Sequence, residues 1–162
     1  MEKLEKAIAN LLAEDARFTP EKIAMMLGEE ETTVRTLIER MEEEGKIVKY
    51  TAILNNEADE DLVEAFIEVK VTPKKGTGFD TVAEEISACT EVKSLYLMSG
   101  AYDFAVIVEG KSLRNISRFV SERISTYDCV LSTATHFILK KYKIEGVVTH
   151  KKGEERRLSV QP

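Results

Sequence analysis

The sequence is poor in the residues that most often hold metals or carry out catalysis. It has only two cysteines, Cys89 and Cys129, and two histidines, His136 and His150. The cysteines lie far apart, form no CxxC spacing and have no histidine cluster beside them, so we expect buried thiols rather than a zinc or redox site. His136 falls within an alternating strand pattern, which favours a structural imidazole. We therefore expect no metal and no cofactor.

The sequence also lacks the patterns of membrane proteins and of common enzyme classes. No apolar run approaches the roughly 20 residues that span a bilayer. The first residues lead directly into an amphipathic helix pattern rather than a signal peptide. There is no nucleophile–base pair, no metal-ligand spacing and no phosphate-binding loop. We therefore expect a cytoplasmic protein that does not contact a membrane and is not an enzyme.

Charge is distributed unevenly along the chain, whose formal net charge is −6. Residues 1–50 carry 8 basic and 12 acidic groups, and residues 51–139 carry 8 basic and 14 acidic groups. Residues 140–162 carry 7 basic and 3 acidic groups, so the basic excess lies at the C-terminal end. We expect this basic extension either to touch DNA or to balance the acidic body of a neighbouring subunit, and the interrupting Glu154 and Glu155 favour the second.

Residues 17–50 have the pattern of a helix, a tight turn, a second helix and a short extended piece. Thr19 and Pro20 are an N-cap and a first-turn proline, and Gly28 and Gly45 end the two helices. The apolar residues at helical spacing are Ile23, Met26 and Leu27 in the first helix, then Val34, Leu37, Ile38 and Met41 in the second. With an earlier helix over 4–12, this predicts a winged helix-turn-helix DNA-binding domain over residues 1–50.

A second domain is predicted after a polar, acidic connector over residues 51–61. Residues 63–71 alternate between apolar and polar, which is typical of a strand with one core face. A helix over 79–88, strands over 92–98 and 104–108, a helix over 112–125 and a strand over 130–139 follow. The order β-α-β-β-α-β predicts a ferredoxin-like domain over residues 62–145, an α+β fold, with a basic extension over 146–162.

One face of this antiparallel sheet would carry both helices, which leaves the other face uncovered. We expect Leu95, Leu97, Phe137 and Leu139 to lie on that uncovered face, where they are more apolar than solvent favours. Association of two such faces would bury them. The pattern therefore predicts a symmetric homodimer.

Four short motifs, in order along the chain, resemble those of one family of transcription regulators. Residues 11–18, LLAEDARF, are similar to LL-x-E-N-x-R, and residues 37–47, LIERMEEEGKI, to RI-x-x-LE-x-x-G-x-I. Residues 100–103, GAYD, are similar to a G-x-YD hairpin turn, and residues 132–140, STATHFILK, to a T-x-T…LK final strand. Over about residues 1–145 the chain thus resembles the leucine-responsive regulator and AsnC (Lrp/AsnC) family.

The resemblance implies dimers built through the second domain, possibly assembled into tetramers of dimers, with an effector amino acid at the contacts between dimers. By position, the effector-binding residues would be Gly100, Tyr102, Asp103, Ser132, Thr133 and Thr135. A zwitterion needs donors for its carboxylate and an acceptor for its ammonium group, which glycine amides, hydroxyls and Asp103 can supply. A structural alternative stays open: Gly100 could adopt positive φ, Asp103 could cap the turn, and threonines suit strands.

The second helix of the helix-turn-helix departs from the family pattern, because glutamates replace a serine N-cap and one basic residue is missing. The residues left to contact double-stranded DNA are Lys22, Thr32, Thr33, Arg35, Thr36, Arg40, Lys46 and Lys49. We expect glutamates on this helix to pair with Arg35 and Arg40 at i,i+4 spacing on a solvated face. Three glutamates at the helix start mostly repel phosphate.

These patterns lead to one functional hypothesis and one alternative. The first is a sequence-specific DNA-binding transcription regulator that responds to an amino acid or a related small metabolite. The alternative is an oligomeric protein that senses a small ligand and whose DNA binding is weakened or lost.

Overall fold

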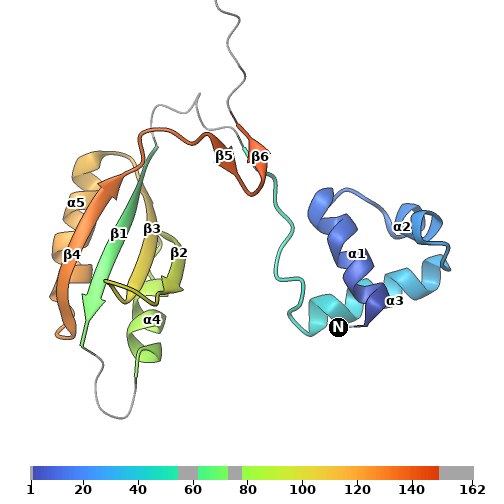
Figure 1. Ribbon diagram of the computed structural model, residues 1–162, viewed down its shortest axis with the longest axis horizontal. Coiled ribbons are helices and arrows are strands. Elements are labelled where there is room, and N and C mark those ends of the chain that lie inside the picture. The colour runs from blue at the N-terminus through green and yellow to red at the C-terminus, as the bar shows by residue number, and fades with distance from the viewer. Residues whose placement is uncertain (1, 55–61, 73–77, 150–162) are drawn as a thin grey trace, which may run out of the picture. The chain divides into compact units, whose positions relative to one another are not determined.

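The computed structural model of the protein describes residues 2–54, 62–72 and 78–149 (Figure 1). The chain divides into two compact units, residues 1–54 and 55–162. Each unit has its own hydrophobic core. The predicted connector over 51–61 and the predicted extension over 146–162 lie largely outside the described residues, and so does His150.

The N-terminal unit consists of three helices, α1 (Lys3–Glu14), α2 (Pro20–Leu27) and α3 (Glu31–Glu43). The Thr19 side chain accepts a hydrogen bond from the backbone N–H of Lys22, so α2 begins as its N-cap pattern predicts. Gly28 ends α2 with φ of 70°, a left-handed conformation that favours glycine. The core of this unit consists of Ile8, Leu12, Ile23, Ala24, Val34, Ile38 and Met41.

Two local expectations for this unit differ from the structure. Met26 is 51% exposed, because the stripe of α2 that faces the core runs through Ile23, Ala24 and Leu27 and leaves Met26 beside it. The segment over 46–50 that was expected to form the wing contains no strand. Instead, the Tyr50 hydroxyl donates a hydrogen bond of 2.7 Å to Glu42 on α3.

The second unit contains a four-stranded antiparallel sheet in the order β2-β3-β1-β4. The strands are β1 (Val63–Val71), β2 (Val92–Leu97), β3 (Phe104–Gly110) and β4 (Val130–Phe137). Helix α4 (Asp80–Ser87) connects β1 to β2, and α5 (Leu113–Glu122) followed by the 3-10 turn η2 (Ile124–Thr126) connects β3 to β4. The predicted α+β, ferredoxin-like order is confirmed.

Both helices pack on one face of this sheet. Side chains from α4 and α5, among them Ile86 and Phe119, join Ile67 and Val69 of β1 in one core. Residues that pair directly across antiparallel strands point to the same face. Leu95 pairs with Val106, and Phe137 with Ala65, and both pack against this core.

The prediction that Leu95 and Phe137 lie on the uncovered face was therefore wrong. The uncovered face carries the alternate residues of each strand, which are Phe66, Glu68 and Lys70 on β1, Ala105 and Ile107 on β3, Ser94 and Tyr96 on β2, and Ser132, Ala134 and His136 on β4. Leu97 pairs with Phe104 on the helix-covered side, although it is 60% exposed. Leu139 follows the end of β4 and is 96% exposed.

A two-stranded hairpin follows the sheet and is formed by β5 (Lys143–Ile144) and β6 (Val147–Val148). The Thr149 hydroxyl donates a hydrogen bond to the backbone carbonyl of Lys141. The Lys141 side chain also pairs with Glu64 of β1. None of the described helices is both long enough and apolar enough to cross a bilayer.

Candidate DNA-binding and effector-binding sites

Helix α3 presents the side chains that the sequence predicts to face DNA. Val34, Ile38 and Met41 are buried against the other two helices. The intervening positions, which are Thr32, Thr33, Arg35 and Thr36, are exposed. The Arg35 side chain is 55% exposed and pairs with Glu31, one helical turn earlier, as expected. This surface of α3 is therefore free of the core and rich in hydroxyl groups around one arginine.

A buried carboxylate lies beneath the other basic residues of this domain. Glu5 on α1 is only 2% exposed, although it is charged. The Arg40 guanidinium donates to Glu5 Oε1, and the Lys46 ammonium lies 3.2 Å from Glu5 Oε2. The hydrogen bond from Arg40 lowers the pKa of Glu5 below its ordinary value and outweighs burial, which acts in the opposite direction; Lys46 lowers it further.

Arg40 and Lys46 are thus bound to carboxylates within the domain. Each also contacts Glu44, at 3.9 Å for Arg40 and 2.6 Å for Lys46. This ion cluster joins α1, the C-terminal turn of α3 and the residues that follow α3. Sequence reasoning missed it because 35 and 41 residues separate Glu5 from its two partners. The available signal was an acidic residue in register with Ile8 and Leu12 on the buried face of α1.

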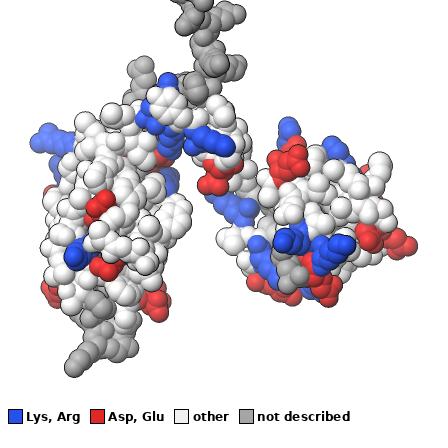
Figure 2. All heavy atoms as spheres, in the orientation of Figure 1, with Lys and Arg blue, Asp and Glu red and all other residues white. Residues whose placement is uncertain are grey.

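The two remaining basic candidates of this unit lie on its surface. The Lys22 ammonium lies 4.3 Å from the centre of the Phe18 ring, and both Lys22 and Lys49 are exposed. On the face that Figure 2 shows, acidic and basic side chains are interspersed over this unit. Glu30, at the N-cap position of α3, makes no capping hydrogen bond through its side chain.

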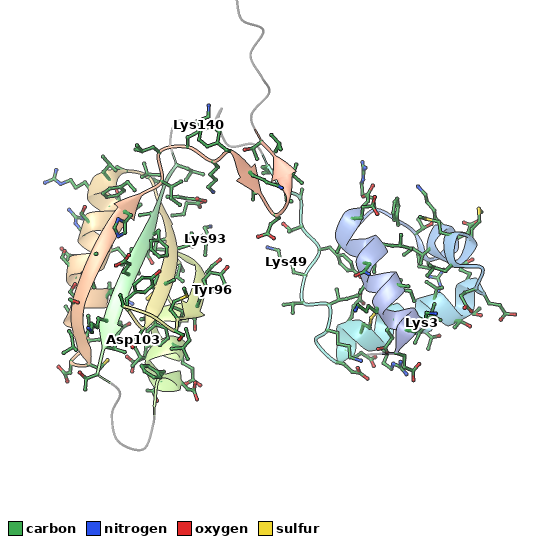
Figure 3. The ribbon with its side chains drawn as sticks, in the orientation of Figure 1. Lys3, Lys49, Lys93, Tyr96, Asp103 and Lys140 are labelled. Atoms are coloured by element: carbon green, nitrogen blue, oxygen red, sulfur yellow. The ribbon has the colours of Figure 1, made fainter. Side chains whose placement is uncertain are left out.

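In the second unit, Asp103 ties the β2–β3 hairpin turn to the end of β1 (Figure 3). Its carboxylate oxygen Oδ2 accepts a 2.8 Å hydrogen bond from the backbone N–H of Val71. Its own backbone N–H donates to the carbonyl of Val69, and its carbonyl accepts from the N–H of Met98. The Asp103 side chain thus binds β1 and not the turn that it was considered to cap, and Gly100 does not have the positive φ that was considered for it.

The other predicted effector residues divide between the two faces of the sheet. Ser132 pairs with Lys70 on the uncovered face. Thr133 and Thr135 pair with Val69 and Ile67, whose side chains point toward the helices. Tyr102 packs the edge of its ring against Phe66, with 5.9 Å between the ring centres. Within one chain, Tyr102 and Ser132 thus contact or pair with residues of the uncovered face, whereas the two threonines point to the other face.

Lys70 is a candidate residue that sequence reasoning did not select. It stands on β1 between Asp103, which is hydrogen-bonded to residues 69 and 71, and Ser132 on β4. Neighbouring strands lie about 4.8 Å apart, so these three side chains start from adjacent positions. The signal available in the sequence was a lysine at one of the polar positions of a strand in which apolar and polar residues alternate. The group offers a cation, a carboxylate and a hydroxyl at the end of β1.

Comparison with known proteins places these features in a family. Residues 64–148 match the model of the Lrp/AsnC ligand binding domain. An HTH-type transcriptional regulator of Bacillus subtilis (strain 168), YugG, is 46% identical over 160 residues, which cover 98% of this chain and 96% of YugG. The chain belongs to the Lrp/AsnC family. It is an HTH-type transcriptional regulator with a ligand-binding domain, which is a class of regulators and not of enzymes.

Solved structures share the fold of this Lrp/AsnC regulator. A transcriptional regulator of Neisseria meningitidis, NMB0573, solved as a complex with L-Met, aligns with a TM-score of 0.71 at 22% identity and covers 89% of this chain and 93% of that one. The leucine response regulatory protein LrpA of Mycobacterium tuberculosis aligns with a TM-score of 0.75 at 23% identity, over 90% and 97% of the two chains. Identities this low show the fold alone.

Proposed function

We propose that this Lrp/AsnC regulator binds double-stranded DNA through α3 as a homodimer and binds an amino acid beside the end of β1. The observation that best supports the effector proposal is the group of Lys70, Asp103 and Ser132, which offers both charges that a zwitterion requires. The L-Met complex of the N. meningitidis regulator supports an amino acid as the class of ligand.

In the proposed DNA complex, Arg35 and the threonines around it read bases or contact phosphates. An arginine can donate two hydrogen bonds to guanine, and threonine hydroxyls suit either bases or phosphates. Lys22 and Lys49 contact the phosphate backbone. Arg40 and Lys46, which the sequence placed among the DNA contacts, are assigned here to the Glu5 cluster that holds α3 in place.

In the proposed effector complex, the ammonium group of the amino acid approaches the Asp103 carboxylate, of which Oδ2 already accepts from Val71. The α-carboxylate pairs with the Lys70 ammonium and accepts a hydrogen bond from the Ser132 hydroxyl. Gly100 belongs to the turn that ends at Asp103, and a methyl group at Gly100 would meet nothing within 4 Å in the protein itself. A bound ligand can therefore approach the turn closely.

The homodimer uses the uncovered face of the sheet. Three pairs of polar side chains on this face contact each other within the chain: Lys93 lies 2.9 Å from Glu109, the His136 imidazole lies 3.4 Å from Glu68, and Lys141 contacts Glu64. Apolar side chains lie among these pairs, and they are Phe66, Tyr96, Ala105 and Ile107. Protein interfaces combine apolar and polar side chains, and a second copy supplies the same surface in two-fold symmetry.

A thermal-shift screen against the twenty amino acids tests the effector proposal. A specific ligand stabilises the folded protein by about 2.7 kcal/mol at a concentration 100 times its Kd. We expect at least one amino acid to raise the melting temperature. The variants Lys70→Gln and Gly100→Ala lose this response, whereas the matched control Thr135→Val, on the opposite face of the sheet, keeps it. A screen without any response, or one in which only Thr135→Val loses it, contradicts the proposed site.

Binding to the DNA upstream of its own gene, compared with a random duplex of equal length, tests the DNA proposal. A removed base contact costs about 1–3 kcal/mol, which is roughly 10- to 100-fold in affinity, so Arg35→Ala should bind the specific DNA that much more weakly. The control Glu39→Ala, also exposed on α3, should not weaken binding. If the wild-type protein binds both duplexes equally even at low salt, this regulator does not recognise that DNA.

A further inference from the structure

Glu31 lies in the first turn of α3 and is the carboxylate that Arg35 binds. Arg35 Nη2 donates to Glu31 Oε1, one helical turn earlier, and the two side chains are 55% and 45% exposed. Glu39 lies one turn after Arg35 and is also exposed. Among the described residues, however, no nitrogen of the Arg35 side chain lies within 4 Å of the Glu39 carboxylate. Arg35 is thus held toward the start of the helix.

Arg35 differs from the other basic residues around α3 in the carboxylate that it binds. Arg40 and Lys46 both bind Glu5, whose side chain is only 2% exposed, so these two cations are tied to the interior of the domain. Glu31 lies at the surface, and Arg35 stays accessible beside it. Arg35 is therefore the arginine of α3 that can reach a ligand while it keeps its carboxylate.

The guanidinium of Arg35 has donors left for such a ligand. An arginine carries five N–H donors in a rigid planar fork, and the contact with Glu31 uses one N–H of Nη2. The remaining N–H groups still include a parallel pair, which is what O6 and N7 of guanine accept in the major groove. Thr32 and Thr36 are exposed and follow Glu31 and Arg35 directly, so their hydroxyls extend the same surface.

On the basis of the proposed DNA contact of α3, we propose that Glu31 is a positioning residue that directs Arg35 to a guanine. A carboxylate that binds one side of a guanidinium orders the long side chain before DNA arrives, which lowers the entropy that binding costs. The planar fork then presents its free donors in one orientation. The preferred DNA is therefore an operator that carries a guanine opposite Arg35 in each half-site.

The charge of Glu31 favours guanine over phosphate as the partner of Arg35. The Arg35–Glu31 pair has no net charge, so a backbone phosphate is attracted to it less strongly than to a free arginine. The guanine acceptors O6 and N7 are uncharged and are not repelled by the carboxylate in this way. Glu31 thus weakens binding to DNA of any sequence and raises the ratio of specific to non-specific affinity.

A purely structural role of Glu31 predicts a different result. An acidic residue in the first turn of a helix stabilises the helix through its dipole. Loss of that contribution would lower the melting temperature and would change the affinity for every duplex alike. Positioning of Arg35, in contrast, changes which sequence the protein prefers.

Selection of binding sites from a pool of random-sequence duplexes, with the full-length protein and its variants, tests the proposal. We expect wild type to select a sequence with a guanine in each half-site, and we expect Glu31→Gln and Arg35→Ala to lose the preference at that position. Glu39→Gln is the matched control, because it removes the same charge at the same spacing from Arg35 without removing a contact. It should select the same guanine as wild type.

Affinities for the selected duplex and for a scrambled one, measured over a range of salt concentrations, give the size of the effect. In Glu31→Gln the ratio of the two affinities should fall at least about tenfold, as for the loss of a base contact. Its affinity for the scrambled duplex should rise, and the slope of log affinity against log salt should become steeper by about 0.9, because Arg35 gains a phosphate contact. Circular dichroism should show that all variants are folded.

The double variant Glu31→Gln with Arg35→Ala separates positioning from direct repulsion of DNA. If Glu31 acts through Arg35, the double variant has the same affinity ratio as Arg35→Ala alone. A further loss of the ratio in the double variant overturns the proposal. So does a Glu31→Gln protein that selects the same guanine as wild type, or one whose affinities for both duplexes change equally.

The same selection distinguishes this proposal from the proposed DNA-binding function. A wild type that selects no sequence refutes sequence-specific DNA binding and the role of Glu31 together. A wild type that selects a sequence which Arg35→Ala still selects leaves the regulator specific for DNA and refutes only the role of Glu31 and Arg35. An equal loss of preference in Glu31→Gln and Glu39→Gln also refutes it, because only Glu31 contacts Arg35.

Discussion

Glu5 shows how one residue that does not face DNA can control how a recognition helix is presented. Its carboxylate is buried at the junction of α1 with the end of α3, and two cations from the α3 side bind it. A buried carboxylate that lost its partners would be strongly unfavourable, and two cations that lost the carboxylate would separate into solvent. The cluster therefore fixes the position of α3 on α1.

Glu5→Gln should destabilise the N-terminal domain more than Glu21→Gln, a substitution of an exposed glutamate on α2. The amide keeps the shape of the side chain but loses the charge that binds Arg40 and Lys46. Circular dichroism during thermal unfolding at neutral pH measures the difference. Equal melting temperatures for the two variants would show that the cluster contributes no stability.

A triple variant separates stability from DNA contact. If Glu5, Arg40 and Lys46 are all replaced by methionine, the buried carboxylate and its two partly exposed partners become apolar side chains, and such a replacement of an ion cluster is often neutral or stabilising. We expect this protein to regain the melting temperature that Glu5→Gln loses and to keep most of its specific DNA affinity. A stable triple variant without specific DNA binding would return Arg40 or Lys46 to the list of DNA contacts.

The low pKa of two carboxyl groups predicts how this domain responds to acid. Hydrogen bonds from Arg40 lower the pKa of Glu5 from 4.5, and those from Arg17 lower the pKa of Asp15 from 3.8 to about 2. A carboxyl group whose pKa is lower in the folded state stabilises fully above its unfolded pKa and loses that contribution as pH falls through the folded one. Unfolding free energy should therefore be flat near neutrality and fall from about pH 4.5 toward pH 2. Glu5→Gln should show a shallower fall, as measured by urea unfolding across this range.

At the scale of secondary structure, the turn between α2 and α3 depends on a left-handed residue. Gly28 has φ of 70°, where a side chain costs about 1–2 kcal/mol. Gly28→Ala should therefore destabilise the N-terminal domain by about 1 kcal/mol. Gly100→Ala is the matched control, because Gly100 has no positive φ and open space around it, and it should unfold like wild type. Urea unfolding compares the two, and equal destabilisation by both would contradict the assigned conformations.

The elements themselves could be predicted from the sequence, because periodicity and capping are local. Thr19 and Gly28 mark the ends of α2, and the alternation over residues 63–71 marks β1. Which side chains of each strand face the helices was harder to predict from the sequence. Leu95 and Tyr96 are neighbours, and only the pairing of β2 with β3, which shifts register between Val92 and Ser94, decides which of them faces the helices.

The residues of the candidate sites also divide into those that could be selected from the sequence and those that could not. The exposed residues of α3 follow from its helical period, so Arg35 and its threonines could be selected from the sequence. Glu5 and Lys70 could not, since each acquires its neighbours only when distant segments pack. Thr133 and Thr135 were selected with Ser132 as one motif, although alternation along β4 turns them to the other face.

For the whole molecule, the acidic groups around α3 mean that one helix-turn-helix should bind DNA weakly. Two units on one dimer bind with an effective concentration set by their connection, and such coupling raises affinity by about 10²–10⁴-fold. In this view the second domain decides whether the first can function. An amino acid that alters association would then alter DNA binding by linkage.

The most direct test of this view is the DNA affinity of a folded protein that cannot form the sheet-face dimer. Tyr96→Arg places a charge on that face, on the edge strand β2, at a position exposed enough to leave the fold intact. Sedimentation should confirm loss of the dimer, circular dichroism an unchanged fold, and titration with its own upstream DNA an affinity at least about 100-fold below wild type. Wild-type DNA affinity in a folded protein without the sheet-face dimer would contradict the account.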